Sequence, residues 1–399
     1  MTIGIIGAGA AGMAAAVEAS RNIHNKVIVF ERQARVGRKL QATGNGRCNL
    51  SNMGLQACSY HGEQPEFVLS ALKYYSVEET LSWFRELGLY TVAEESGRVY
   101  PYSDQANSVV DILRFALEKE NIVLHLGTAV KKIKKQNEGF LIECDKLEQY
   151  CDRLIIACGG LAGTKLGGTM SGYKLLGKLG HRCTKLRPTL VQLKSDWSTL
   201  ASLKGVRTNC SIEILKNQQI YSNSTGELQF TEYGLSGPVV FEVSRDVCAT
   251  PGNWSARIDF LPHISAEQLL KELKRRIERN VPASELLTGI LHNRLGRVLT
   301  QASGVSGAVR EYQLQAVCDA VKAFAINLTE PMGMDSAQVT AGGILTEQFD
   351  PDTMESKLVP GLYACGEVLD IDGDCGGYNL QWAWSSGRLA GCNAGRETQ

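Results

Sequence analysis

The feature that most constrains this chain is a glycine-rich turn close to its amino terminus. Residues 7–12 read Gly-Ala-Gly-Ala-Ala-Gly, directly after the apolar run 2–6 and directly before an alanine-rich stretch at 13–20. A strand, this turn and a helix, in that order, bring backbone N–H groups to the pyrophosphate of a dinucleotide. Gly7 makes the tight turn, Gly9 lets the phosphate approach, and Gly12 lets the helix pack on the strand. The turn predicts a bound adenine dinucleotide, and the alternative is a purely structural turn in an α/β enzyme.

A second buried strand, residues 26–31, completes the start of a βαβ unit and ends in an acid. Glu31 lies about 20 residues beyond Gly12, where a carboxylate accepts hydrogen bonds from the adenosine ribose and repels a 2′-phosphate. A βαβ start requires a parallel sheet with helices packed on its faces. We therefore predict an α/β fold built on a Rossmann-like domain.

The character of the chain changes twice, which predicts an interrupted domain. From about residue 189 alternating strand-like segments replace the α/β pattern, and that pattern returns after about 332. We predict a nucleotide-binding domain in two parts, 1–188 and 333–399, with an inserted β-rich domain at 189–332.

Hydrophobic periodicity predicts individual elements within these domains. Ser265 and Gln268 have the spacing of a capping box, which begins a helix in a small helical subdomain of the insert at about 264–325. We expect a three-stranded meander at 122–126, 129–134 and 140–144. The other predicted elements are helices near 77–87, 108–120, 284–300 and 309–324, and strands at 154–157, 211–215, 219–221, 227–230, 256–260 and 361–365.

A second glycine-rich junction between a strand and a helix lies near the other end of the sequence. Gly366 and Glu367 close a strand, and residues 373–379 precede a helical run at 380–390. One pyrophosphate needs one such turn, whereas a second turn suits a long cofactor whose other end must also be held. A helix amino terminus beside the N1/C2 carbonyl of a flavin would stabilise the negative charge that accumulates on reduction. This junction favours FAD over NAD, and its alternative interpretation is a tight loop between packed elements.

Together these segments resemble the BaiN-like and aminoacetone-oxidase-like FAD flavoproteins of the two-dinucleotide-binding-domain superfamily. The resemblance covers nearly the whole chain. It rests on residues 7–12; Gly37-Arg38-Lys39 with Thr43-Gly44-Asn45-Gly46-Arg47-Cys48-Asn49; Gly159-Gly160; Leu235-Ser236-Gly237-Pro238; Ala341-Gly342-Gly343-Ile344; Thr353-Met354-Glu355-Ser356-Lys357; and residues 361–367 running into Gly376-Gly377-Tyr378-Asn379-Leu380-Gln381. It implies FAD, a discontinuous cofactor domain and an inserted domain over the flavin.

The resemblance also implies which residues contact the cofactor. In this family the loop 38–49 lies along FAD, so Arg38 and Lys39 would neutralise the diphosphate while Arg47, Cys48 and Asn49 approach the isoalloxazine. The complete set of expected cofactor contacts is Gly7, Gly9, Ala10, Ala11, Gly12, Glu31, Arg32, Arg38, Lys39, Thr43, Gly44, Asn45, Arg47, Cys48, Asn49, Val130, Gly159, Gly366, Glu367, Gly377, Tyr378, Asn379 and Leu380.

Two segments depart from the family pattern. Relatives usually carry Thr-His-Tyr-Gly where this chain has Thr231-Glu232-Tyr233-Gly234, and the segment after Gly160 lacks the expected proline. We therefore assign no catalytic histidine by resemblance.

Four residues are candidates for catalysis. Arg47 could stabilise reduced flavin or a substrate oxyanion, or it could simply form a structural ion pair. Tyr378 could donate a proton, or could serve only in packing. Glu232 and Tyr233 could face the substrate from the insert, or lie on a surface loop. A redox role for Cys48 or Cys375 is disfavoured, because flavin disulfide reductases use a Cys-x-x-x-x-Cys pair and position 53 is methionine.

The leading functional hypothesis is an FAD enzyme that takes hydride from NADH or NADPH and reduces a carbon–carbon double bond conjugated to a carbonyl. The small organic substrate could be steroid-like. The alternative is an oxidase of amines or amino-ketones that releases hydrogen peroxide, and a third hypothesis is a flavin-binding module without turnover. No second GxGxxG marks a dedicated nicotinamide domain, so a nicotinamide would bind transiently over the flavin.

Composition narrows the partners and the location. Lys+Arg and Asp+Glu both number 42, so neither nucleic acid nor an anionic membrane is expected as a partner. No apolar run reaches about 18 residues, which argues against a membrane span. Twelve scattered cysteines without a secretory signal indicate reduced thiols and a cytoplasmic location. The six histidines form no ligand-spaced cluster, so no metal site is expected. Oligomeric state is not predicted.

Overall fold

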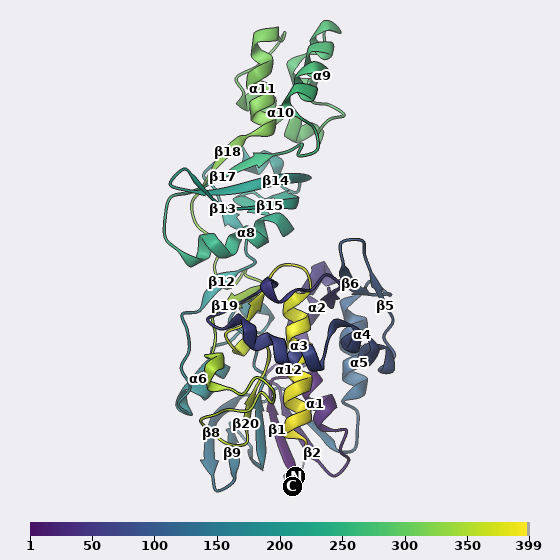
Figure 1. The fold of residues 1–399 in the computed structure, drawn as a ribbon, viewed down its shortest axis with the longest axis vertical. Coiled ribbons are helices and arrows are strands. Elements are labelled where there is room, and N and C mark those ends of the chain that lie inside the picture. Colours follow the sequence, from purple (N-terminus) through teal and green to yellow (C-terminus); the bar gives the residue numbers. More distant parts are fainter. Residues whose placement is uncertain (397–399) are drawn as a thin grey trace. The chain divides into compact units, whose positions relative to one another are not determined.

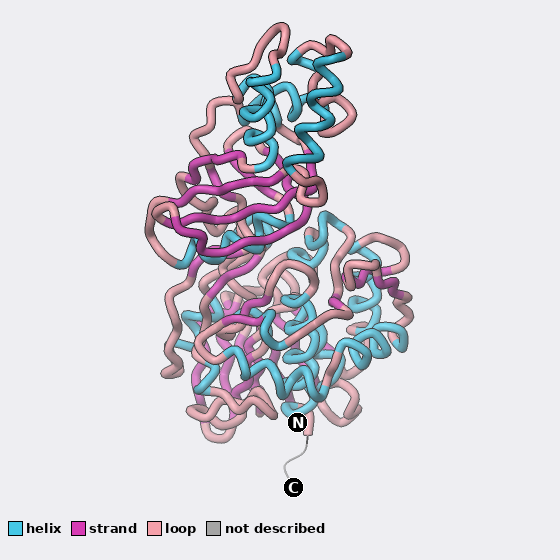
Figure 2. Tube along the Cα trace, turned by 45° about the horizontal axis from the view of Figure 1, so that its top comes forward, coloured by secondary structure: helices cyan, strands magenta, loops and turns pink. Residues whose placement is uncertain are grey.

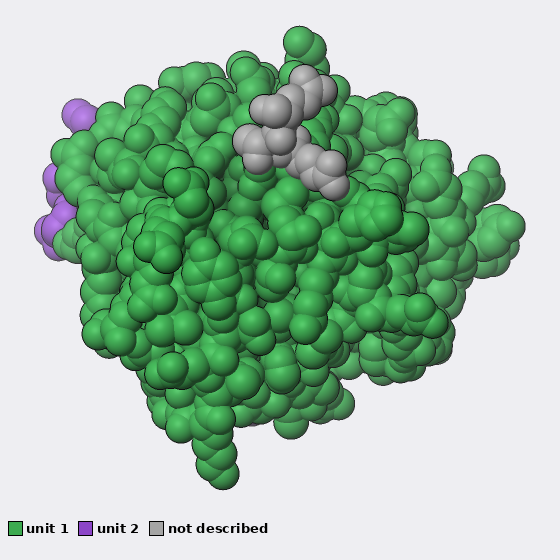
Figure 3. Space-filling view, turned by 90° about the horizontal axis from the view of Figure 1, so that it is seen from below, with its two compact units in different colours: residues 1–187, 338–399 green, residues 188–337 purple. Residues whose placement is uncertain are grey.

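The computed structural model describes residues 1–396, which form two compact units (Figure 1). Unit 1 comprises Met1–Arg187 and Gln338–Gln399, and unit 2 comprises Pro188–Ala337 (Figure 3). Each unit has its own cluster of buried apolar side chains. The chain therefore passes once from unit 1 into unit 2, which has its own core, and then returns to unit 1. Among the described residues no helix is long and apolar enough to cross a membrane.

A five-stranded parallel sheet forms the centre of unit 1. Its strand order is β20 (Leu362–Ala364), β11 (Arg153–Ile156), β1 (Thr2–Ile6), β2 (Lys26–Phe30) and β7 (Ile122–His125). Ile5 lies opposite both Ile155 and Val29 in parallel register. Consecutive residues of β1 and β2 are buried, because helices cover a parallel sheet on both faces. The predicted α/β, Rossmann-like fold with a parallel sheet is confirmed.

One strand of the predicted meander belongs to this sheet instead. β7 pairs in parallel with β2, so the prediction that it pairs with the strand after it is wrong. The N–H groups of Gly127 and Thr128 donate to the carbonyl oxygens of Gln33 and Glu31, which keeps the chain beside the segment after β2 and prevents it from folding back. The observed antiparallel meander is β8 (Val130–Gln136), β9 (Gly139–Cys144) and β10 (Glu148–Cys151).

Helices and small sheets complete unit 1. The helices are α1 (Ala10–Ala19), α2 (Arg38–Gln41), α3 (Val68–Tyr74), α4 (Val77–Glu86), α5 (Ala106–Ala116), α6 (Ser171–Lys178) and α12 (Tyr378–Ala394). The small antiparallel sheets are β3 (Ser51–Asn52) with β6 (Arg98–Pro101) and β5 (Thr91–Ala93), and β4 (Tyr60–His61) with β21 (Asp372–Gly373). β12 (Arg187–Thr189) and β19 (Val339–Ala341) lie near the points where the chain passes between units. Most residues of α12 are buried, so this helix, yellow in Figure 1, is a core element of unit 1.

Unit 2 combines a six-stranded antiparallel sheet with helices (Figure 2). The strand order is β13 (Leu193–Lys194), β16 (Gly234–Ser236), β15 (Gln219–Phe230), β14 (Arg207–Lys216), β17 (Trp254–Asp259) and β18 (Phe324–Leu328). The helices are α7 (Leu200–Leu203), α8 (Pro238–Ala249), α9 (Ala266–Glu278), α10 (Asn293–Ala302) and α11 (Leu314–Lys322).

The element boundaries in unit 2 differ from the prediction, most clearly for one strand and one helix. The strands expected at 219–221 and 227–230 are one strand, because the residues between them continue to pair with β14. The helix expected from 284 begins at Asn293, after a left-handed Gly289 with φ 78°. The capping box is confirmed: Gln268 N donates to Ser265 Oγ at 3.2 Å, and Ser265 N donates to Gln268 Oε1 at 2.9 Å.

Candidate functional site

The amino-terminal turn has the geometry that its glycines predict. Gly7 has φ +106°, and a Cβ there would lie 2.4 Å from the carbonyl oxygen of Ala157. A Cβ on Gly12 would lie 1.9 Å from the carbonyl oxygen of Gly7, so α1 packs on the turn only with glycine at this position. Nothing lies within 4 Å of a Cβ built on Gly9. The turn is therefore closed on its inner side and open at its middle glycine.

The amino terminus of α1 is uncapped and faces this opening. Its N-cap is Gly9, no side chain caps it, and its first turn contains no acid. The first N–H groups of such a helix have no partner within the helix and carry partial positive charge. Glu31, which is 9% exposed, is fixed beside the turn because its carboxylate accepts from the N–H groups of Ala8 at 2.8 Å and Gln33 at 2.7 Å.

The carboxyl-terminal junction is built in a comparable way. Gly376 and Gly377 have φ +140° and +104°, and a Cβ on Gly377 would lie 2.4 Å from the carbonyl oxygen of Ser51. Asn379 fixes the loop before the helix, since its Oδ1 accepts from Gly373 N at 2.9 Å and its Nδ2 donates to Gly373 O at 2.6 Å. No side chain caps α12, so a second uncapped helix amino terminus results.

The two uncapped helices lie side by side and run in the same direction. A Cβ on Gly387 would lie 2.4 Å from Ala11 O, and one on Gly391 would lie 2.2 Å from Ala15 O. The backbones approach this closely only because α12 carries glycine at the contacts. Gly387 is the tenth residue of α12 and Ala11 the second of α1, so the amino terminus of α12 projects eight residues, about 12 Å, beyond that of α1. The two positive helix ends are therefore offset along one direction. This arrangement suits a long cofactor that carries a hydrogen-bond acceptor at each of two separate positions.

Lys39 and Glu367, both expected to contact the cofactor, form an ion pair with each other. Lys39 Nζ lies 2.8 Å from Glu367 Oε2. Glu367 Oε1 also accepts from the N–H of Thr340 at 2.8 Å. Arg38 donates from Nη1 to Gln33 Oε1 at 2.8 Å, and Arg32 donates from Nη2 to Gly167 O at 2.8 Å. The α2 segment is thereby connected to the end of β20 and to the segment that follows β2.

Arg47 is held by two carboxylates. Its Nη2 lies 2.9 Å from Glu94 Oε1, its Nε pairs with Asp104, and its guanidinium lies 4.0 Å from the centre of the Tyr100 ring. The hydrogen bonds that Arg47 donates to Asp104 and Glu94 raise the pKa of its guanidinium. The structural ion pair that the sequence left open is therefore present, and the cation is already neutralised by its neighbours.

The remainder of this loop is tightly turned and partly buried. Gly44 and Asn45 adopt left-handed conformations with φ 56° and 57°, and Thr43 Oγ1 donates to Leu40 O at 2.7 Å. Cys48 is fully buried, and burial raises the pKa of its thiol to about 12, which makes it a poor nucleophile at neutral pH. Asn49 Oδ1 is buried and has no hydrogen-bond partner among the described residues. An orphaned acceptor in this loop is consistent with a ligand that carries a donor.

The remaining predicted site residues lie in several places. Gly159 follows β11 with φ +68° and open space around its Cβ position, while Val130 begins β8. The ring of Tyr378 lies edge-on to that of Tyr60, with ring centres 6.2 Å apart. Glu232 and Tyr233 belong to unit 2, where Glu232 pairs with Lys204 at 2.7 Å and Tyr233 Oη donates to Gln192 Oε1 at 2.5 Å.

Sequence reasoning missed several polar residues at the second junction. Tyr60 Oη donates to Tyr378 O at 3.0 Å, and His61 Nε2 lies 2.7 Å from Asp374 Oδ1. Asn52 and Arg98 also reach Gly376. No local motif marks these residues, because only the small sheets β3–β6–β5 and β4–β21 bring them to α12.

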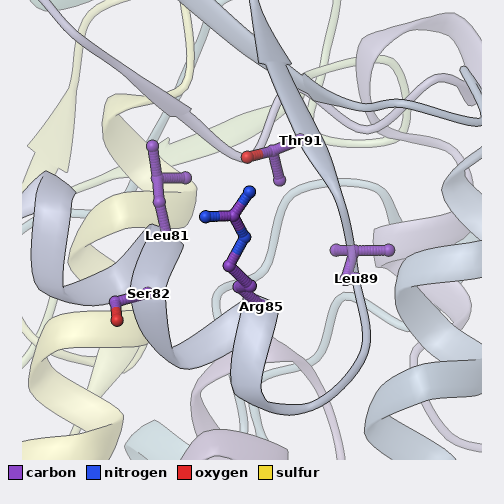
Figure 4. Close-up of a pocket in the computed structure, with 5 residues that line it drawn as sticks. All are labelled: Leu81, Ser82, Arg85, Leu89 and Thr91. Carbon is purple, nitrogen blue, oxygen red and sulfur yellow. The ribbon is translucent and has the colours of Figure 1, made fainter.

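A surface cavity of about 340 Å³ lies apart from these residues (Figure 4). It is lined by Leu81, Ser82, Arg85, Leu89 and Thr91, which come from α4, the first residue of β5 and the segment between these two elements. None of the predicted cofactor contacts lines it, so we do not regard it as the cofactor site.

The parallel sheet and its two glycine junctions define an FAD-dependent oxidoreductase of the Rossmann-like class. The sequence profile of the HI0933-like protein Rossmann domain matches residues 1–393, and the chain belongs to that family. This confirms the family indicated by the sequence motifs.

Similar proteins extend over the full chain. The 3-dehydro-bile acid delta(4,6)-reductase of Clostridium scindens is 40% identical and is aligned over 98% of each chain. A ribosomal RNA dihydrouridine synthase of Escherichia coli is 32% identical over 96% of this chain and 95% of that protein. Among solved structures, 3-ketosteroid delta1-dehydrogenase from Sterolibacterium denitrificans has a TM-score of 0.54 at 12% identity, covering 99% of each chain, which is a likeness of fold.

Proposed function

We propose that this enzyme reduces a carbon–carbon double bond conjugated to a carbonyl, with FAD as cofactor and NADH or NADPH as electron donor. The proposal rests on a reaction type that two relatives with different substrates have in common. A 3-dehydro-bile acid delta(4,6)-reductase and a dihydrouridine synthase are both named for adding two hydrogens to a double bond conjugated to a carbonyl. Common chemistry at 40% and 32% identity supports the same chemistry here.

The residues of unit 1 fit FAD. Gly9 leaves open the space that a Cβ would fill, and the uncapped start of α1 supplies N–H groups of Ala10, Ala11 and Gly12 for the pyrophosphate. Glu31 would accept hydrogen bonds from the adenosine ribose. The orphaned acceptor of Asn49 is available for a donor on the cofactor.

At the other end, the start of α12 would hold the flavin ring. FAD, when bound, supplies hydride transfer between the nicotinamide and the β-carbon of the substrate. The first N–H groups of α12, at Tyr378, Asn379 and Leu380, stabilise negative charge next to them. Tyr378 is the candidate proton donor to the α-carbon of the substrate.

We propose a small organic substrate, with a steroid-like enone as the first choice. Residues 188–337 contain 15 Lys or Arg and 15 Asp or Glu, so unit 2 has no excess of positive charge to attract RNA. The relative with the higher identity is also the one named for a small molecule. An RNA substrate is the competing possibility, because the second relative acts on ribosomal RNA by its name.

Anaerobic reduction of the purified yellow protein tests the proposal. NADH or NADPH should bleach the flavin, and a 3-oxo-Δ4 steroid acid should restore the colour faster than buffer alone. If an unmodified ribosomal RNA transcript restores the flavin colour and the steroid does not, the proposed reaction type would stand, but the substrate would be RNA. Failure of both nicotinamides to bleach the flavin, with rapid peroxide formation from an added amine, would replace the proposal with the oxidase.

A further inference from the structure

The small sheet beside the second junction brings an arginine to the start of α12. β6 pairs with β3 so that Arg98 lies opposite Asn52. Asn52 is buried, and its Nδ2 donates to the carbonyl oxygen of Gly376 at 3.0 Å. This hydrogen bond fixes the pair of strands against the glycine turn, so Arg98 is positioned by backbone pairing and not by a flexible loop.

Three side chains converge on Gly376. A Cβ built there would lie 3.3 Å from the Tyr378 ring, 3.4 Å from Asn52 Nδ2 and 3.6 Å from Arg98 Nε. The guanidinium therefore lies beside the turn from which α12 begins. Tyr378, the candidate proton donor, is part of the same cluster.

Arg98 is half-buried and has no anionic partner. Across residues 1–396 its guanidinium makes no ion pair and no hydrogen bond. The nearby acids are engaged elsewhere: Glu94 pairs with Arg47, and Asp374 pairs with His61 at 2.7 Å. An unpaired cation beside the positive end of a helix is unfavourable until negative charge arrives between them.

We propose that Arg98, and not Arg47, stabilises the negative charge on the pyrimidine end of the reduced flavin. Arg47 is neutralised by two carboxylates, whereas Arg98 is unpaired and lies at the helix end assigned to that ring. The inference rests on the proposed function, because it takes FAD as the ligand.

Sulfite titration of the FAD-loaded protein tests this role without any substrate. Sulfite adds through its sulfur electron pair to N5 of oxidised flavin, so negative charge appears at the N1–C2 end and the yellow colour is lost. Arg98→Met and Arg98→Gln are both neutral at this position. Each should raise the sulfite Kd by about tenfold or more, because a unit positive charge within several ångströms of the flavin is removed. Arg98→Lys should stay within about threefold of the wild type, because it keeps the charge.

A matched control is available in unit 1. Arg85→Met removes an arginine from the cavity lining on α4 and should leave the sulfite Kd unchanged. A sulfite Kd in Arg98→Gln equal to that of the wild type, or equally weak binding in Arg98→Lys, would overturn the inference and leave Arg98 with a packing role. Absence of bound FAD in the wild type would instead count against the proposed function, so the two failures are distinguishable.

Discussion

Glu18 and Arg388 form a buried ion pair that joins α1 to α12, with Oε1 and Nε 2.8 Å apart and only 4% and 6% of the side chains exposed. Arg388→Met leaves the Glu18 carboxylate buried with only its exposed partner Arg21, and should lower the free energy of unfolding by about 3–5 kcal/mol in urea titrations. A double variant, Glu18→Leu with Arg388→Met, should recover most of that loss. Arg21→Met, which removes the exposed partner, should cost less than about 1 kcal/mol. A loss below this control value in Arg388→Met would contradict the argument.

The close approach of α12 to α1 predicts that Gly391→Ala is strongly destabilising. Its Cβ would lie 2.2 Å from the carbonyl oxygen of Ala15, and backbone on both sides prevents relief. We expect a loss of about 2 kcal/mol or more, with weaker FAD binding, in thermal and urea unfolding. Gly177→Ala in α6 is the matched control: nothing lies within 4 Å of its Cβ, so it should stabilise the protein by roughly 0.5–1 kcal/mol. Equal effects at the two positions would refute the packing argument.

Gly9→Ala should weaken cofactor binding without affecting the stability of the fold. No atom lies within 4 Å of the new Cβ and the backbone is extended, so the melting temperature of the apoprotein should not change. The Cβ would nevertheless occupy the approach path of the pyrophosphate, and the Kd for FAD should rise by at least about tenfold. Gly333→Ala, also in open space, should change neither quantity. Fluorescence titration with FAD makes the comparison, and an unaltered Kd in Gly9→Ala would show that the phosphate lies elsewhere.

Buried thiols predict alkaline instability. Burial raises the pKa to about 12 for each of Cys48, Cys151, Cys158, Cys210 and Cys248. The unfolded chain releases these protons near pH 8.5, while the folded chain keeps them, so the free energy of unfolding falls as pH rises between about 8.5 and 12. Urea titrations at pH 8 and pH 10 measure this slope.

The same titrations include a test of the cause. Cys210→Ala removes one buried thiol and should make the slope shallower, whereas Cys58→Ser removes an exposed thiol and should leave it unchanged. Identical slopes in the wild type and Cys210→Ala would mean that other groups govern the alkaline transition.

Features encoded within a few neighbouring residues could be predicted from the sequence. The turn at Gly7, the first βαβ unit and the capping box at Ser265 depend on local spacing, and the structure contains each of them. The partner of β7 could not be predicted, because an apolar strand pairs equally well with a neighbour in sequence or with a sheet edge.

The electrostatic state of the site was also inaccessible to sequence reasoning. Arg47 and Arg98 have the same chemistry, and only the fold places Glu94 and Asp104 beside one of them. The sequence therefore indicated Arg47 as the candidate, and could not indicate that two carboxylates pair with it.

The division of unit 1 across the chain has a consequence for synthesis. Unit 2 is complete once residue 337 has left the ribosome, but β20 and α12, which complete the sheet and cover α1, lie at 362–394. Domains fold as units while the chain is made, and translation of the residues between α1 and α12 takes on the order of tens of seconds. During that interval the face of α1 that packs against the glycines of α12 is uncovered and stays available to chaperones. We therefore expect FAD to bind only after the final helix has formed, and a chain that ends before residue 362 would contain unit 2 but would lack β20 and α12.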